Sequence, residues 1–471
     1  MLPFGVHLGF INQPWNSMTV SWWTQSQNTD TKVYYGLSSG SLNMVESSGI
    51  VDGVGTGYIH NVELKNLLPA TTYFYKCGGD SGNSSEFNFT TAPSPKAKEI
   101  HFVAIGDSRS NWERRRMVAD MILKNGTMNY STEAELVIHS GDIVSSGDEQ
   151  DLFDQYHQDL EPLASHIPVM YVAGNHEIGS GGSVYPRQFK EPGNGNEGWF
   201  YSFNWGPVHF IGVDSESHGI PIVDAMDLRW LDEDLRRANQ DNTVLWIVVW
   251  FHKPPFVSFS HEYNLDIRSL WCPMFEKYNV DVVFNGHCHA YQRNYPVSSN
   301  VDIYKTGDPY YVNPPYPIYI VSGAAGVNSD GETQSDLRND AYHAKWNNSA
   351  YGPDGNYVFF DSNHFANVNI TVDESTNKTK LWMDVIGLNT SDSPTESNYS
   401  VYKVDEMSIT KDVSADWYDA PNGITYTGYN FTTGTTGIAL FVVIIGVVGF
   451  IDVMMIIAWR KARNKRKSKK D

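Results

Sequence analysis

The segment 101-HFVAIGDSR-109 sets the pattern from which the fold can be inferred. It is an apolar, β-rich run that ends in a Gly-Asp pair, and four later runs end in similar short polar motifs. These runs are 136-LVIHSGD-142, 168-PVMYVAGNH-176, 244-VLWIVVWFH-252 and 280-VDVVFNGH-287. Buried strands with polar residues at their carboxyl ends are the usual layout of an α/β enzyme site. Five such runs in one chain predict a layered α/β domain with its site at that edge.

The polar residues after these runs form a ligand set for metal ions. Together they supply two carboxylates, one amide and four imidazoles, a mixed oxygen and nitrogen set that suits a pair of divalent cations. The set consists of Asp107, Asp142, Asn175, His176, His252, His287 and His289. Any one of these histidines alone would be better explained as a packed, hydrogen-bonded residue. The ordered series as a whole predicts a dinuclear metal site instead.

The motifs resemble those of the metallophosphoesterase superfamily, and most closely its purple acid phosphatase branch. The family pattern runs GDxG, GDxxY, GNH(E/D), VxxH and GHxH, and four of these five motifs can be laid on the chain directly. The segments 286-GHCHAYQR-293 and 320-IVSGAAG-326 are similar to the family's GHxHxYxR motif and late glycine loop. The segment 59-IHNVELKNLLPATTYFYKCG-78 resembles its N-terminal fibronectin-like domain. The similarity covers roughly residues 3–385.

The resemblance implies that Asp142 bridges two metal ions. The remaining implied ligands are Asp107 and His289 for the first ion, and Asn175, His252 and His287 for the second. Two cations about 3.5–4 Å apart clamp the oxygens of a phosphate ester and lower the pKa of a bridging water. The neutral Asn175 leaves the second cation a better Lewis acid. The resemblance therefore implies metal-dependent hydrolysis of phosphate esters.

Two further histidines are implied to act on the substrate. His176 corresponds to the family's non-ligand histidine, which stabilises the phosphoryl group or protonates the leaving oxygen. His261 falls where the family often has a further substrate-site histidine. By contrast, His139 and His209 lie inside strand-like runs and are expected to be packed and hydrogen-bonded.

Two positions depart from the family pattern. Ser145 replaces a tyrosine that ligates ferric iron in the purple branch, and Arg109 replaces a histidine that serves the first metal ion in many other members. Loss of the phenolate disfavours Fe(III), so Fe(II), Zn(II) or Mn(II) fits the first position better. The guanidinium of Arg109 is expected either to bind a substrate phosphate oxygen or to form a salt bridge with a neighbouring acid.

The chain divides into regions of different composition. Residues 1–95 show short alternating segments separated by turn residues, a pattern typical of an all-β sandwich, here fibronectin type III-like by resemblance. Residues 98–386 alternate strands with helical stretches such as 111–125 and 224–239. This alternation predicts a layered α/β domain, which the resemblance makes a four-layer αββα fold. Residues 387–436 are rich in Ser, Thr, Asn and Asp and predict a polar stalk.

The end of the chain predicts a membrane anchor. Residues 437–459 form an apolar run with a single charge, Asp452, long enough to cross a bilayer as one helix. A buried core helix is the alternative, and the basic residues that follow argue against it. The tail 460–471 holds eight basic side chains and one acidic one, and is expected to face the cytoplasm. Asp452 either binds a partner in the membrane or reaches water near its cytoplasmic side.

The charge distribution limits the class of partner. The chain has a formal net charge of −20, and because the tail is basic, residues 1–459 carry −27. Such an acidic body argues against nucleic acid as a partner. A small phosphate ester and a membrane are the expected partners. The cysteines give no disulfide framework; they are Cys77, Cys272 and Cys288.

Two features bear on topology. Residues 1–4 enter the first β-domain without a charged or apolar leader, so either a signal peptide is missing from this sequence or the protein is tail-anchored. The positive-inside tendency favours the first alternative, which places the large domain outside the cell or in a lumen. Asn-x-Ser/Thr glycosylation acceptors support the same side. They are Asn83, Asn88, Asn125, Asn129, Asn347, Asn369, Asn377, Asn389, Asn398 and Asn430.

These features predict a membrane-anchored, exoplasmic metallophosphoesterase that hydrolyses phosphate monoesters. A phosphodiesterase or nucleotide pyrophosphatase of the same fold is the closest alternative. A third hypothesis is a surface binding protein whose fibronectin-like domain recognises a partner and whose metal site is a relic. The nearly complete ligand series argues against a relic, because decay seldom spares ligands selectively.

Overall fold

A computed structural model describes most of the sequence before residue 421. The described residues are 2–25, 31–54, 57–79, 82–124, 134–179, 181–195, 199–216, 225–257, 264–327, 358–359, 363–388 and 398–420. All of them belong to one unit, Met1–Thr427. The predicted membrane span 437–459, the tail 460–471 and His261 lie outside the described residues. Within those residues, no helix is both long and apolar enough to cross a bilayer.

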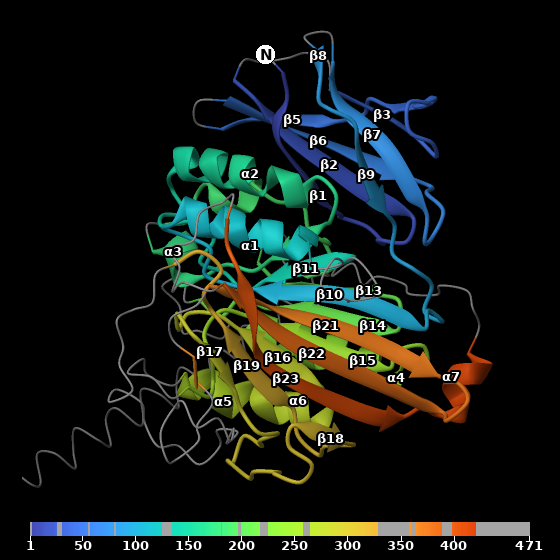
Figure 1. Cartoon of the computed structure of the whole chain (residues 1–471), viewed down its shortest axis with the longest axis vertical. Coiled ribbons are helices and arrows are strands. Elements are labelled where there is room, and N and C mark those ends of the chain that lie inside the picture. Colours follow the sequence, from blue (N-terminus) through green and yellow to red (C-terminus); the bar gives the residue numbers. More distant parts are fainter. Residues whose placement is uncertain are drawn as a thin grey trace, which may run out of the picture. The chain divides into compact units, whose positions relative to one another are not determined.

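The N-terminal region forms two β-sheets (Figure 1). The first has the strand order β1 (Phe4–Gly9), β2 (Ser17–Thr24), β6 (Gly57–Lys65), β5 (Ile50–Val54). The second has the order β4 (Met44–Glu46), β3 (Lys32–Gly36), β7 (Thr72–Gly79), β8 (Gly82–Asn83), with β9 (Phe87–Thr90) paired to β7. Val20 and Trp22 of the first sheet share a buried core with Val33 and Tyr75 of the second. This confirms the predicted N-terminal all-β domain.

Two seven-stranded sheets follow. The first has the order β12 (Val169–Tyr171), β11 (Leu136–His139), β10 (Glu99–Ile105), β21 (His364–Asp373), β22 (Lys378–Leu388), β23 (Val401–Asp412), β18 (Tyr310–Val312). The second has the order β13 (Tyr201–Trp205), β14 (Val208–Gly212), β15 (Trp246–Trp250), β16 (Val282–Asn285), β19 (Ile318–Ser322), β17 (Tyr291–Arg293), β20 (Val358–Phe359). Strands β10 to β12 run parallel, as do β14, β15, β16 and β19. Their carboxyl ends therefore place the polar motifs at shared edges.

Helices cover the outer faces of these two sheets (Figure 1). The helices over the first sheet are α1 (Trp112–Lys124) and α2 (Gln150–Ala164), and those over the second are α4 (Ala225–Gln240), α5 (Leu265–Leu270) and α6 (Cys272–Lys277). The shorter helices are α3 (Asn175–Ile178), η2 (Tyr185–Arg187) and α7 (Ala415–Asp419). Between the sheets, the rings of Phe102 and Phe210 meet edge to face with centroids 5.0 Å apart. The order helix, sheet, sheet, helix is the expected αββα arrangement.

Strand β23 lies where the composition predicts a polar stalk. It pairs with β22 along its length and with β18 on its other side. Its residues Val404, Met407 and Ile409 enter the core between the sheets. Its buried Asp405 is neutralised by buried Arg293, with Nε 2.6 Å from Oδ2. The predicted stalk is therefore wrong over residues 398–420. The composition was misleading because charged side chains that pair inside a sheet cannot be told, from composition alone, from those of a solvated linker.

Helix α2 also contacts the N-terminal sandwich. The N–H of Val6 donates to Oε2 of Glu161 at 3.0 Å, and the hydroxyl of Tyr75 donates to the carbonyl of Ser165 at 2.7 Å, just past the helix. The ring of His7 stacks on a histidine of α2 with centroids 4.3 Å apart, and burial lowers the pKa of His7 to about 4. These contacts tie the sandwich to the helix that follows the Asp142 loop.

Candidate metal centre

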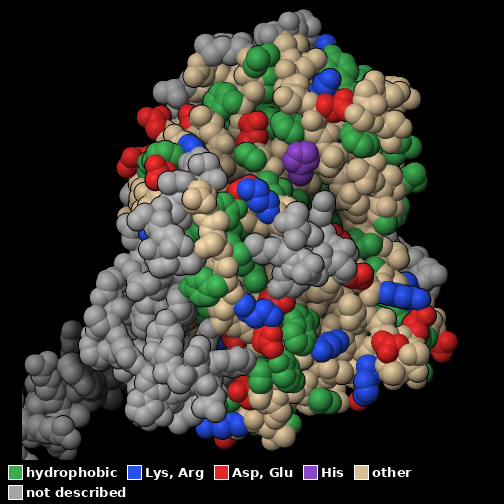
Figure 2. Space-filling model, viewed as in Figure 1, with side chains coloured by type: hydrophobic (Ala, Val, Ile, Leu, Met, Phe, Trp, Pro, Cys, Tyr) green, Lys and Arg blue, Asp and Glu red, His purple; other side chains and the backbone are tan. Residues whose placement is uncertain are grey.

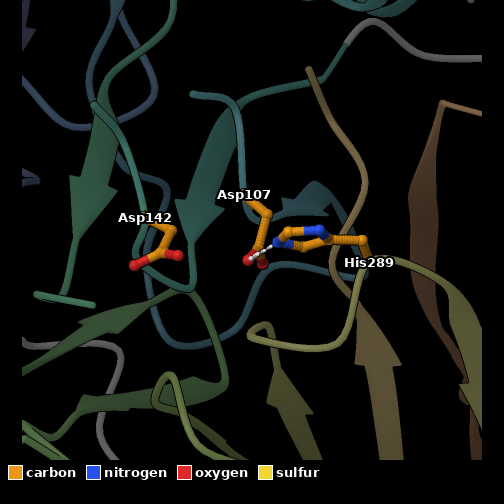
Figure 3. Close-up of side chains that lie close together, drawn as sticks. All are labelled: Asp107, Asp142 and His289. Atoms are coloured by element: carbon orange, nitrogen blue, oxygen red, sulfur yellow. Dashed lines mark ion pairs between the residues drawn. The ribbon is translucent and has the colours of Figure 1, made fainter. Parts of the chain in front are cut away.

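The predicted ligand residues meet at the carboxyl edges of the parallel strands. The strand that precedes each one is β10 for Asp107, β11 for Asp142, β12 for Asn175, β15 for His252, and β16 for His287 and His289. Figure 3 shows Asp107, Asp142 and His289 converging from separate loops. Both sheets therefore contribute to one site, as the placement of the motifs predicts.

One group of ligand atoms, the first metal position, consists of Asp107, Asp142 and His289. One ligand atom from each residue lies within 4.8 Å of the others. Nε2 of His289 is 3.5 Å from Oδ1 of Asp107 (Figure 3). The N–H of His287 donates to both oxygens of Asp107, at 3.1 and 2.9 Å, which fixes that carboxylate. Two buried carboxylates and an imidazole at this spacing can hold one cation.

A second group, the second metal position, consists of Asp142, Asn175, His252 and His287. Oδ1 of Asn175 lies 3.0 Å from Nε2 of His252 and 2.9 Å from Nδ1 of His287. The two imidazole nitrogens are 3.3 Å apart. Nε2 of His252 is also 3.3 Å from Oδ1 of Asp142. Asp142 thus contributes to both positions, which is the geometry that a bridging carboxylate needs.

The hydrogen bonds of His252 show why the second position suits a cation. Nδ1 of His252 lies 2.9 Å from the carbonyl oxygen of Ser140, so this nitrogen donates and Nε2 keeps its lone pair. Burial lowers the pKa of His252, which keeps the ring neutral. Nε2 therefore directs a lone pair toward the oxygens of Asn175 and Asp142. Converging lone pairs repel one another unless a cation lies between them, so this donor set fits a metal ion.

Burial dominates the electrostatics of the two carboxylates. It raises the pKa of Asp107 well above its usual range; the charge of Asp142 adds to this shift, whereas Arg109 opposes it. Burial also opposes ionisation of Asp142, but nearby positive charge, that of Arg109 included, and the backbone N–H of His176 outweigh burial and hold the pKa of Asp142 below its usual range. Asp107 is therefore the carboxylate whose ionisation depends most on a neighbouring cation.

Three of the predicted ligands have left-handed backbone conformations. The φ angle is +55° at Asp107, +54° at Asp142 and +72° at His287. Each such conformation costs a non-glycine residue about 1–2 kcal/mol, and it turns the chain sharply after the preceding strand. Close approach of the loops requires glycine nearby. A Cβ atom on Gly174 would collide with the carboxylate of Asp142, and one on Gly286 would collide with the carboxylate of Asp107.

Glu177 holds the loop that carries Asp142. Its buried carboxylate accepts the backbone N–H groups of Asp142, Ile143, Val144 and Gly174 at distances of 2.9, 2.9, 3.1 and 2.8 Å. Burial and the charge of Asp142 raise the pKa of Glu177 to about 8, and the amides oppose that shift. The only trace of this role in the sequence is the last letter of the GNHE motif. The motif therefore marks a positioning residue as well as a ligand.

Arg109 and His176 both contact Asp142. Nε of Arg109 donates to Oδ2 of Asp142 at 3.1 Å, which is the salt bridge expected as one of its two roles. The N–H of His176 donates to Oδ1 of Asp142 at 3.1 Å, and Nδ1 of His176 lies 3.0 Å from the carbonyl oxygen of Ser145. The side chain of His176 is 30% exposed. It therefore lies on the solvent side of the site, where a substrate would arrive.

The hydroxyl groups of Tyr291, two residues after His289, and of Tyr201 bond to partners outside the two metal positions. The hydroxyl of Tyr291 donates to Asp405, and that of Tyr201 donates to the carbonyl of Tyr171, both at 2.7 Å. Ser145, at the position of the family's ligand tyrosine, is exposed. Tyr291 and Tyr201 are thus packing residues rather than ligands.

The histidines assigned to packing are confirmed in that role. His139 is buried with Nε2 2.9 Å from Oγ of Ser108, and His209 is buried with Nε2 2.9 Å from Oδ2 of Asp234. The three cysteines, all of which are described, form no disulfide bond in the structure. These buried residues are Cys77, Cys272 and Cys288.

Comparison with known proteins identifies the family. Residues 3–91 match the purple acid phosphatase N-terminal domain, and residues 100–291 match the calcineurin-like phosphoesterases. Human acid phosphatase type 7 is 30% identical over 357 residues, which cover 69% of this chain and 78% of the relative. The chain belongs to the purple acid phosphatase family. Purple acid phosphatase 23 of Arabidopsis thaliana is 27% identical over 342 residues, covering 63% of this chain and 71% of that protein.

A solved structure shows the same fold. The purple acid phosphatase PPD1 from yellow lupin (Lupinus luteus) seeds has a TM-score of 0.66 at 19% identity, covering 92% of this chain and 78% of the lupin chain. Family membership makes this purple acid phosphatase a phosphoester hydrolase. The family uses a dinuclear metal centre, typically iron with zinc or manganese. The two metal positions described above fit such a centre.

Proposed function

We propose that this purple acid phosphatase hydrolyses phosphate monoesters and releases orthophosphate. The observation that carries the proposal is the position of Asp142, whose carboxylate lies between the donor atoms of the two metal positions. A carboxylate so placed is what a pair of cations needs to share one water. Monoesters are the favoured class because the similar human protein is named an acid phosphatase.

The residues of the chain divide the work. Two cations held by the residues of the two metal positions would supply a hydroxide near neutral pH and neutralise the phosphate. Nδ1 of His176 is anchored on the carbonyl of Ser145, so the opposite ring nitrogen, Nε2, is directed into the site, 3.8 Å from Oδ2 of Asp142. A protonated His176 can donate its Nε2 proton to the leaving oxygen. We assign His261 as a second histidine that contacts the substrate.

A paired assay tests this function. The purified protein is incubated with a p-nitrophenyl monoester and with a bis-p-nitrophenyl diester, before and after chelation and after return of zinc, manganese or iron. The monoester is expected to be hydrolysed faster, and chelation should abolish its hydrolysis reversibly. Faster hydrolysis of the diester would support the phosphodiesterase alternative. Metal binding without hydrolysis of either ester would support a binding protein with a relic site.

A small ester rather than a nucleic acid is the proposed ligand of the site. The chain is strongly acidic, with a formal net charge of −20. On the face drawn in Figure 2, acidic and basic side chains of the described residues are interspersed and do not gather into one large basic patch. Nucleic acid binding at physiological salt needs such a patch. The phosphatase is therefore expected to pass through a heparin column without retention.

We further propose that residues 1–436 lie outside the cell or in a lumen, with 437–459 as the membrane span. Three of the glycosylation acceptors are exposed in the structure, namely Asn83, Asn377 and Asn398. Protease added to intact cells should remove the large domain and leave a small protected fragment with the basic tail. A glycosidase should reduce the apparent mass of the protein. The reduction should be smaller for Asn377→Gln than for the wild type, because the variant has one acceptor fewer. Protection of the large domain from protease would instead show tail anchoring.

A further inference from the structure

Arg109 occupies part of the first metal position. Its Nε donates to Oδ2 of Asp142 at 3.1 Å, and its Nη2 lies 3.2 Å from Nε2 of His289. Because a guanidinium only donates, Nε2 of His289 must be the acceptor. Two of the three residues that form the first metal position thus already bind a cation. That cation belongs to the protein itself.

The main chain and a neighbour hold Arg109 in this place. Its backbone N–H donates to the carbonyl oxygen of Asp142 at 3.2 Å, and its Nη1 donates to the hydroxyl of Ser110 at 3.1 Å. The side chain of Arg109 is 17% exposed, and that of Asp142 is 2% exposed. The ion pair is therefore mostly shielded from water, where charge-assisted bonds are strong.

The second metal position is built differently. There the oxygen of Asn175 and a nitrogen of each of His252 and His287 face one another, at 2.9–3.3 Å. A cation that enters this group meets neutral donors and relieves the repulsion between the lone pairs of Asn175 and His252. A cation that enters the first position must instead break the bonds of Arg109. Metal binding is therefore favoured by the contacts at the second position and opposed by those at the first.

We propose that Arg109 is an internal cation that competes with the first metal ion, so that the two metal positions fill with unequal affinity. The second position fills first, and the first fills only when the guanidinium withdraws from Asp142 and His289. This inference rests on the proposed dinuclear function. Because a metal ion must break the bonds of Arg109 to enter the first position, the wild type is expected to bind it there roughly 10- to 100-fold more weakly than a chain without this guanidinium.

Metal binding without substrate tests the proposal. The chelated full-length protein is titrated with Zn²⁺ in a calorimeter, and bound metal is counted by mass spectrometry. The wild type should show one tight and one weak ion per chain. Arg109→Met removes the charge at similar length, and should tighten the weak ion by roughly 10-fold or more while leaving the tight ion unchanged. Arg114→Met is the matched control, because Arg114 bonds Asn363 instead, and should change neither ion.

A spectroscopic readout separates the two positions directly. At two equivalents of Mn²⁺ and low total concentration, the wild type should show the electron paramagnetic resonance signal of isolated ions. Arg109→Met at the same loading should show a coupled pair. Should Arg109→Met fail to fold, Arg109→Lys keeps the charge without the planar fork, and should tighten the weak ion by a smaller factor.

Two outcomes would overturn the proposal. One is a wild type that binds two ions with equal affinity. The other is an Arg109→Met protein, folded as judged by circular dichroism, in which the weak ion is unchanged or weaker. Neither outcome depends on hydrolysis, so the proposed phosphatase function stands or falls separately, by the ester assay.

Discussion

The two metal positions share Asp142 but balance charge in opposite ways. The second position gathers neutral donors, the amide of Asn175 and the ring of His252 among them, in an arrangement that suits a cation. The first position combines buried carboxylates with Arg109, so its charge is already partly balanced by the chain. The second position can therefore accept a metal ion directly, whereas at the first position a metal ion has to displace Arg109.

The largest effect is expected at the residue common to both positions. Asp142→Ala removes a ligand from each metal ion, and should lower monoester hydrolysis by more than about 1,000-fold, a barrier increase of about 4 kcal/mol. Initial rates and bound metal are measured together. Asp151→Ala, on the exposed start of α2, is the control and should keep full activity. Wild-type turnover by Asp142→Ala with metal still bound would disprove the dinuclear assignment.

Single ligands from the two positions should differ in their effect on metal content. His252→Ala removes a donor from the second position, and should weaken the binding of the tight ion there by more than about 100-fold. His289→Ala removes a donor from the first position, where Arg109 competes with metal, and should leave the tight ion at the second position in place. Both should lose hydrolysis. Metal content after dialysis distinguishes them, and equal loss of metal in both variants would show that the positions are equivalent.

Glu177→Gln should give an intermediate effect. A glutamine has one acceptor oxygen for the four amides that the carboxylate now accepts, and its amide group donates where acceptors are needed. Each buried amide left unsatisfied costs about 1–3 kcal/mol. Thermal unfolding should therefore shift down by several degrees, and hydrolysis should fall because Asp142 is displaced. An unchanged unfolding curve would mean that the loop holds its shape without this carboxylate.

The smallest change expected is one of colour. Charge transfer from tyrosinate to Fe(III) needs a phenolate at the first position, and Ser145 cannot supply one. Because Tyr291 and Tyr201 bond to other partners, iron-loaded, oxidised protein should show no purple band in its visible spectrum. Ser145→Tyr is the variant that can restore the band. A visible band in the unmutated protein that bleaches on reduction would show that another tyrosine ligates iron.

The sequence predicts the ligands better than it predicts their surroundings. Every ligand comes shortly after a strand, so a local motif is enough to find it, and the comparison with relatives confirms the family. The contacts of Arg109 with Asp142 and His289 join segments that are distant in the chain, and local pattern cannot show which expected role the guanidinium adopts. Strand β23 could not be predicted for a related reason. Its buried Asp405 is paired with Arg293, which is distant in the sequence, so the local pattern does not show that this charge is neutralised.

The left-handed backbone at Asp107, Asp142 and His287 has an evolutionary consequence. Glycine adopts this conformation freely, whereas each side chain there costs about 1–2 kcal/mol. Replacing any of the three by glycine would thus relieve strain while deleting a ligand. A selection for heat resistance alone would enrich such replacements and yield robust proteins without catalysis. The three residues persist in a lineage only while hydrolysis itself is under selection.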